Sequence, residues 1–94
     1  MPTEVRGAAN KIEHSNRTDG TGVVTVTPNS PANFILIDNT HATQNVLVSF
    51  DAGTTFKTIK PGVTLTLDVS QLKSYQIKGS AAGTTSEALH GLED

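Results

Sequence analysis

The stretch of sequence that decides the fold is VSFDAGTTFKTIKPGVTLTLDV, residues 48 to 69. Two turn signals divide it into three extended runs. Asp51 and Gly53 predict a hairpin turn, because aspartate can hydrogen-bond its own backbone and glycine accepts a positive φ. Residues 60–63, KPGV, have the signature of a type II turn. The stretch therefore predicts successive strands that reverse direction at each turn.

Hydrophobic periodicity supports strands on both sides of these turns. Alternation along residues 63–69 and 75–78 predicts strands with one buried face. The side chains expected to point inward are those of Val63, Leu65, Leu67, Val69, Tyr75 and Ile77. Residues 33–39, NFILIDN, form a short apolar run that predicts a strand buried on both faces. Residues 70–74, SQLKS, are expected to form a short link, with a turn of helix as one option.

The whole pattern predicts an all-β protein. About seven short strands recur at intervals of roughly 10 to 12 residues, which is typical of a small antiparallel β-sandwich or barrel. Half-buried alternation favours antiparallel sheets that each have one wet face. The strand count fits both an immunoglobulin-like and a jelly-roll-like sandwich, and the sequence does not separate these two.

The N-terminal residues differ in composition from the rest of the chain. Residues 1–20 contain charges, Gly, Asn and Ser without a clear period, so we predict an extended arm that is flexible or becomes ordered on a partner. Residues 21–94 are predicted to form the β-sandwich domain. No apolar segment in the arm resembles a secretion signal, which favours synthesis and retention in a cytoplasm.

Size and composition restrict the classes of function. The chain has 94 residues, of which 35% are hydrophobic, and it contains no cysteine. So small a core without disulfides favours stabilisation by a partner, so we expect a homo-oligomer or docking onto a larger body. A net charge of −2 with scattered basic residues argues against nucleic acid as a partner. No apolar run is long enough for a membrane helix, so no membrane partner is expected.

Residues capable of chemistry are present but are not arranged in a recognisable site. His14, His41 and His90 lack the spacing of metal ligands, and a local hydrogen bond between His41 and Asp38 is the expected arrangement there. Neither a nucleophile elbow nor a glycine-rich loop before a helix occurs. We therefore predict no catalytic residue, no metal and no cofactor, and the protein is not expected to be an enzyme.

Residues 45–84, which include VSFDAGTTFKTIKPG and then YQIKGSAAGT, resemble small β-sandwich virion proteins of tailed bacteriophages. The residues that carry this resemblance have structural roles, and they are Asp51, Gly53, Phe56, Ile59, Pro61 and Gly62. The resemblance implies a capsid decoration (cement) protein that docks on the major capsid protein, or on another virion protein, and stabilises the shell. It implies a location on the virion capsid surface after synthesis in the host cytoplasm, and an oligomer that is frequently a trimer.

Two alternatives to a decoration protein stay open. One is a tail, neck or fibre accessory or receptor-binding domain of a phage. The other is a carbohydrate-binding module or a small hydrolase, which would need a concave pocket lined by residues such as His41 or Asp68. For a binding role, the predicted partner-contact residues are Val5, Arg6, Lys11, Ile12, His41 and Thr43.

Overall fold

The computed structural model describes residues 12–92, which form eight β-strands and no helix. In chain order the strands are β1 (Ile12–Asp19), β2 (Val24–Val26), β3 (Ala32–Asn39), β4 (Val46–Ser49), β5 (Lys57–Ile59), β6 (Thr64–Leu72), β7 (Tyr75–Gly79) and β8 (Thr84–Gly91). The prediction of an all-β antiparallel sandwich is confirmed, with eight strands in the described part of the chain where about seven were expected.

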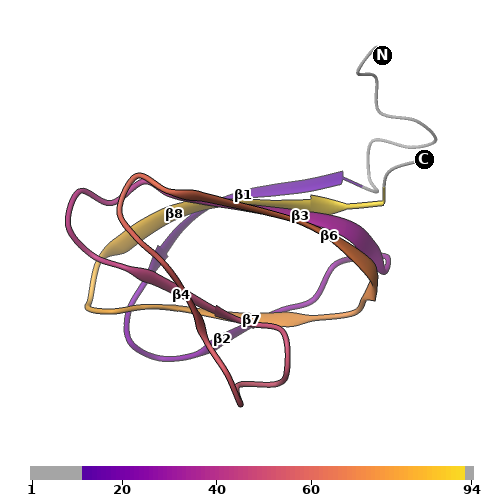
Figure 1. Cartoon of the computed structure of the whole chain (residues 1–94), viewed down its shortest axis with the longest axis horizontal. Helices are drawn as coiled ribbons and strands as arrows, with labels where there is room; N and C mark the ends of the chain where they lie inside the picture. Colours follow the sequence, from indigo (N-terminus) through magenta and orange to yellow (C-terminus); the bar gives the residue numbers. More distant parts are fainter. Residues whose placement is uncertain (1–11, 93–94) are drawn as a thin grey trace, which may run out of the picture.

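The strands form two four-stranded sheets that face each other across the core (Figure 1). One sheet has the order β1-β8-β3-β6 and the other β2-β7-β4-β5, and every pairing is antiparallel. Successive strands cross between the sheets for most of the chain, which is the connectivity of a jelly roll. The strand order thus resolves the choice between the two sandwich types that the sequence left open.

The core lies between the two sheets and is built from short runs of alternating residues. Its fully buried members come from both layers and are Ile35, Ile37 and Ala88 on one side and Val46, Val48, Ile59, Tyr75 and Ile77 on the other. Burial of each large aliphatic side chain contributes about 1.5–3 kcal/mol relative to exposure. The inward orientation predicted for Tyr75 and Ile77 is confirmed.

The first strand corrects the predicted boundary of the N-terminal arm. Residues 12–19 were assigned to the arm, but they form β1, which pairs with β8 along its whole length. The inward side chains of β1 are polar, which hid the strand from a search for apolar alternation. Two of them satisfy each other, because the Arg17 guanidinium donates to both Asp19 carboxylate oxygens at 3.0 and 3.1 Å. Residues 1–11 lie outside the described part.

The apolar run in residues 33–39 is less buried than predicted. Ile35 and Ile37 are fully buried in the core, whereas Phe34 and Leu36 point to the outer face of their sheet and are half-buried. Although β3 lies between β6 and β8, its sheet is covered within residues 12–92 on one face only, by the other layer. The strand is therefore buried on one face, as expected for an antiparallel sandwich.

Both predicted turns are present. In the 60–63 turn Val63 N donates to Lys60 O at 3.0 Å and Gly62 has a φ of +76°, as a type II turn requires. Gly53 has a φ of +88° in the hairpin turn that joins β4 to β5. The predicted link at 70–74 is wrong in part, because β6 continues to Leu72. Val63 was expected to be buried but is 47% exposed, since it closes the turn rather than facing the core.

Candidate interaction surface

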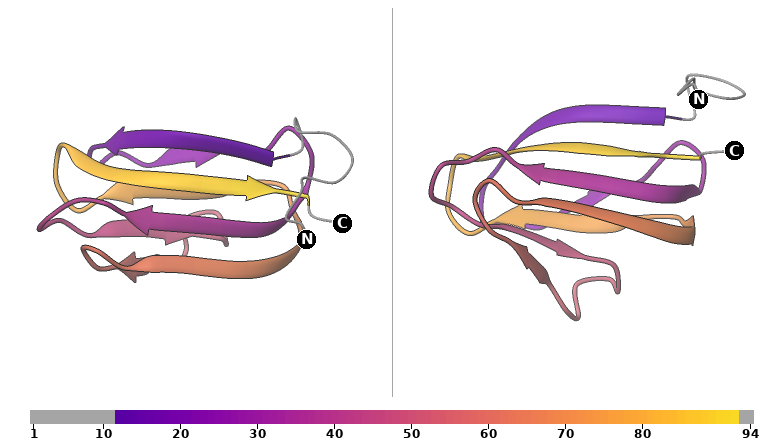
Figure 2. Two further views of the ribbon diagram at one scale, coloured as in Figure 1. Left: turned by 90° about the horizontal axis from the view of Figure 1, so that it is seen from above. Right: turned by 45° about the horizontal axis from the view of Figure 1, so that its top comes forward.

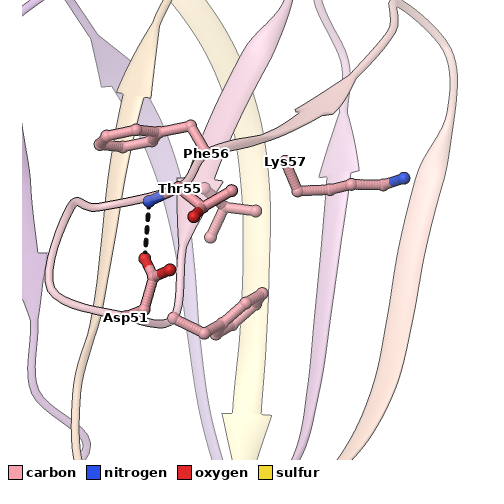
Figure 3. Close-up of a pocket in the computed structure, with 6 residues that line it drawn as sticks. Asp51, Thr55, Phe56 and Lys57 are labelled. Carbon is pink, nitrogen blue, oxygen red and sulfur yellow. Dashed lines mark hydrogen bonds between the residues drawn. The ribbon is translucent and has the colours of Figure 1, made fainter.

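A pocket of about 290 Å³ opens at the β4–β5 hairpin (Figure 3). Its wall is mainly apolar, and its lining residues are Val48, Phe50, Asp51, Thr55, Phe56 and Lys57. In Figure 3 the Lys57 side chain extends away from the Asp51 carboxylate, so the two charges do not converge on one point. The pocket combines an apolar wall with a single fixed carboxylate at its rim.

A compact hydrogen-bond network shapes this hairpin. The Ser49 hydroxyl donates to the Asp51 carboxylate at 2.7 Å, and it accepts the Gly53 N–H at 2.9 Å. The same carboxylate accepts the Thr55 N–H at 2.8 Å (Figure 3). Ala52 has a φ of 60°, so two successive residues of this turn lie in the left-handed region that allows the tight reversal. The hairpin is therefore held by a carboxylate that accepts donors on both sides of the turn.

These hydrogen bonds lower the pKa of Asp51, with the Ser49 hydroxyl as the largest cause and Thr55 as the next. Because the folded pKa lies below the unfolded one, the contribution of Asp51 to stability is present above the unfolded pKa. It is lost as the pH falls through the folded pKa. A general base that works near neutral pH needs the opposite shift, so the geometry favours a structural role for Asp51.

We predict that the Thr55 amide resonance will titrate with Asp51 at a midpoint below 3.8, the usual pKa of the side chain. An NMR titration of the folded protein measures this midpoint. Asp51→Asn should abolish the transition at the Thr55 amide while leaving distant carboxylates unaffected. A midpoint at or above the usual value would contradict the hydrogen-bonded geometry of the hairpin.

The two aromatic residues of the pocket also have internal partners. The Lys78 ammonium lies 4.4 Å from the centre of the Phe56 ring, a distance suited to a cation–π contact. The Phe50 ring packs against the Tyr75 ring with centroids 6.2 Å apart. Both phenylalanines are half-buried, so each contributes to the sandwich and leaves part of its surface at the pocket. Such a wall can contact an apolar side chain of another protein.

A second pocket, of about 440 Å³, lies where β3 begins and β6 ends. The register between β3 and β6 shifts at this point, where β6 has two more residues between Asp68 and Leu72 than β3 has between Ala32 and Phe34. The lining residues carry no charge, and they are Pro31, Ala32, Asn33, Val69, Ser70, Gln71 and Leu92. Neither pocket is lined by His41 or Asp68, which were named above as examples of residues that could line the pocket of a hydrolase or carbohydrate-binding module.

A series of three hydrogen-bonded polar side chains links β7, β8 and β1, and sequence reasoning did not find it. Tyr75 and His90 are buried, whereas the Glu13 side chain is 31% exposed. The Tyr75 hydroxyl lies 2.9 Å from His90 Nδ1, and His90 Nε2 lies 3.1 Å from Glu13 Oε1. Because a carboxylate only accepts, Nε2 carries the proton and Nδ1 accepts the tyrosine hydroxyl. The same Glu13 oxygen also accepts the Asn29 N–H at 2.8 Å.

Tyr75, His90 and Glu13 stand in the order of a nucleophile, a base and an orienting acid, but their environment opposes catalysis. Tyr75 is only 2% exposed, and burial raises its pKa to about 12. An activated nucleophile needs a lowered pKa and access to substrate. These three side chains therefore provide hydrogen-bond partners for buried polar groups, and they attach β1 to the core.

The predicted contact residues do not form one cluster. Val5, Arg6 and Lys11 lie outside the described residues. Ile12 begins β1 and pairs with Gly91, in the same row of the sheet as Phe34. The loop with His41 and Thr43 follows the opposite end of β3, roughly 20 Å away at about 3.3 Å per residue.

The loop around His41 also corrects a predicted hydrogen bond. Nδ1 of His41 accepts the backbone N–H of Thr43 at 3.1 Å and that of Gln44 at 3.0 Å. Asp38 instead accepts the hydroxyl of Thr64 at 3.1 Å. The imidazole thus orders its own loop, and its second ring nitrogen keeps the proton.

Within residues 12–92 no three His, Asp or Glu side chains come together in a group that could hold a metal ion. In the same part of the chain, no helix has the length and apolarity needed to cross a bilayer.

Comparison with known proteins gives a likeness of fold. The chain matches no protein-family model, and no curated protein matches it. Among solved structures it is similar to a chain from Bacillus endospore appendages, which form a family of disulfide-linked pili. The TM-score is 0.55 at 16% sequence identity, and the match covers 97% of this chain and 100% of that chain. The likeness between the two proteins is therefore one of fold.

Proposed function

We propose that the protein is a structural subunit that works by binding neighbouring protein subunits in a large assembly. The observation that carries this proposal is the similarity to a pilus chain over nearly the whole of both chains. The proposal also agrees with the structural roles of three ionisable side chains in the described part. Asp51 and His90 are engaged in hydrogen bonds that hold the fold, and the Tyr75 hydroxyl is buried against His90.

Within this class we propose a capsid decoration protein of a tailed bacteriophage, with the major capsid protein as its partner and the virion surface as its location. The resemblance in residues 45–84 supports this assignment. The residues that carry the resemblance form the β4–β5 hairpin and the turn that follows it. Binding would be adhesive, with modest contacts multiplied over many copies on a repeating surface.

A second candidate is a subunit of a fibre or tail, which the similarity to pili favours. The pilus neighbour is described as disulfide-linked, whereas this sequence contains no cysteine. Subunits of such a fibre would therefore be held together by non-covalent contacts. The two candidates differ in the partner and agree that the sandwich serves as a building block.

Co-sedimentation with capsids that lack the protein tests the capsid assignment. The separation of Ile12 from His41 allows the two groups of predicted contacts to be tested independently. We expect Arg6→Glu combined with Lys11→Glu to lower the affinity at least about tenfold, because reversed charges at an interface repel the partner. His41→Ala combined with Thr43→Ala should lower it about threefold, since it removes fewer contacts.

Val23→Ser is the matched control, because this exposed side chain lies outside both groups and should leave binding unchanged. Failure of the unaltered protein to pellet with capsids would contradict the capsid assignment. Binding by the unaltered protein and all variants alike would contradict the predicted contact residues.

A further inference from the structure

The four edge strands of the sandwich differ in how well they are protected. An edge strand exposes unpaired N–H and C=O groups that can pair with another chain. The edges are β1 and β6 in one sheet and β2 and β5 in the other. Strands β2 and β5 have only three residues each. Strand β1 directs the charged side chains of Glu13, Arg17 and Asp19 inward, which is a recognised protection against pairing.

Over residues 64–70, strand β6 has neither a short length nor inward-facing charges. It is the longest strand of the described part, with nine residues and a single charged side chain, that of Asp68. It contains no proline or lysine, and in Figure 2 it lies at the margin of its sheet. Leu65, Leu67 and Val69 face the core but stay half-buried, because no further strand of the described chain covers them.

The hydrogen-bond pattern shows which backbone groups of β6 point outward. Asn39 N donates to Val63 O at 3.0 Å, so the Val63 carbonyl points toward β3, while the Val63 N–H donates to Lys60 O in the turn. In an antiparallel pair this orientation alternates along the strand. Leu65 and Leu67 therefore bond to β3, whereas the N–H and C=O groups of Thr64, Thr66 and Asp68 face the open edge.

We propose that β6 pairs with β6 of a second copy of this chain, in antiparallel orientation about a two-fold axis at Leu67. In this register Thr66 lies opposite Asp68 of the second copy, and its hydroxyl can donate to that carboxylate. The outward-facing backbone groups of both residues meet as a hydrogen-bonded pair. The inward row places Leu65 opposite Val69 of the second copy, so apolar side chains cover each other.

Charge excludes the neighbouring register on one side, and the strand geometry limits the length of the pairing. If the two-fold axis lay at Asp68 instead of Leu67, Asp68 would lie opposite Asp68 of the second copy, where like charges destabilise the pair. Gln71 has a φ of 54°, which interrupts the extended backbone after Ser70. Pairing thus extends over residues 64–70 and joins two four-stranded sheets into one continuous sheet of eight strands.

A two-fold contact of this kind closes at two copies, because each β6 is occupied by its equivalent. It leaves the β4–β5 hairpin in the other sheet free for further contacts. The inference holds for either assembly proposed above, since it concerns only how two copies of this chain meet. It names a different partner from the capsid protein and is tested on the purified protein alone.

Analytical ultracentrifugation of the full chain, with charge changes at the proposed pair, provides the test. Thr66 is exposed, so substitutions there avoid the core. We expect Thr66→Lys to tighten the dimer and Thr66→Asp to weaken it, each by between about twofold and thirtyfold for the two symmetric pairs. Thr66→Asp combined with Asp68→Lys should restore association, because it exchanges the two charges.

Both effects should shrink as salt is raised, since the charges are exposed. Thermal unfolding of each variant at a concentration where it is monomeric serves as the control for the fold. The inference would be overturned by an unaltered protein that is monomeric at about 1 mM. It would also be overturned if Thr66→Lys and Thr66→Asp weakened association equally, which is the result for a register with Thr66 opposite itself, or if a trimer formed.

Discussion

Tyr75→Ala is expected to lower the free energy of unfolding by about 3–5 kcal/mol, a large share of the stability of so small a domain. Tyr75 is among the largest fully buried side chains of the described chain. Its ring packs against Phe50 and meets the His90 imidazole edge-on with centroids 5.6 Å apart. Truncation removes these contacts, leaves a cavity between the sheets, and deprives His90 Nδ1 of its donor.

Tyr75→Phe separates the ring from the hydroxyl and is expected to cost about 1–3 kcal/mol, the penalty for one unsatisfied buried partner. It should also change the response to alkali. The pKa of about 12 lies above the usual 10, so the unfolded chain loses its proton first and stability falls above pH 10. Tyr75→Phe removes the ionisable hydroxyl, so the loss of stability above pH 10 should be smaller in this variant.

Urea denaturation followed by circular dichroism, at neutral pH and between pH 9 and pH 11, measures both effects. Equal destabilisation by the two substitutions would contradict this prediction, because it would mean that packing of the Tyr75 ring contributes nothing to the free energy of unfolding. An unchanged alkaline slope in Tyr75→Phe would show that the hydroxyl ionises equally easily in the folded and unfolded chain.

Gly79→Ala is expected to destabilise the fold by about 3 kcal/mol, near the upper end of what overpacking typically costs. A Cβ at this position would lie 2.5 Å from the Thr84 Cβ and 3.0 Å from the Ala81 carbonyl oxygen. Thr84 cannot move aside easily, because it is buried and its hydroxyl donates to Ala81 O at 2.8 Å. The Gly79 N–H also donates to Gly20 O at 2.8 Å, which resists a shift of β7.

Gly22→Ala is the matched control for this prediction. No atom lies within 4 Å of a Cβ built there, so the same chemical change should be neutral or stabilise slightly, by up to about 1 kcal/mol. Thermal unfolding of both variants provides the comparison. A melting temperature for Gly79→Ala equal to that of Gly22→Ala would contradict the tight contact between β7 and β8.

Local chemistry accounts for the parts of the fold that were predictable. The 60–63 turn needs proline and then a glycine at positive φ, and both residues stand where the turn requires them. The inward positions of Tyr75 and Ile77 follow from strict alternation with polar neighbours. Such signals act within a few residues and can be recognised without knowledge of the rest of the chain.

The parts that escaped prediction depend on residues distant in the chain. Strand β1 carries Glu13 inward because His90, seventy-seven positions away, supplies a partner for it. Seen alone, a charged residue at that position argues against a strand. The β4–β5 pocket likewise forms only when the hairpin folds, although its hairpin residues were identified. The exposure of Phe34 and Leu36 depends on which face the second sheet covers.

The central claim is that this chain functions by adhering to protein neighbours in a repeating assembly. Imaging the native particle or fibre at side-chain resolution by electron cryo-microscopy tests it most directly. The account predicts many copies of the sandwich at equivalent positions, each in contact with other protein subunits. Finding the protein only as a free monomer, absent from any such assembly, would contradict it.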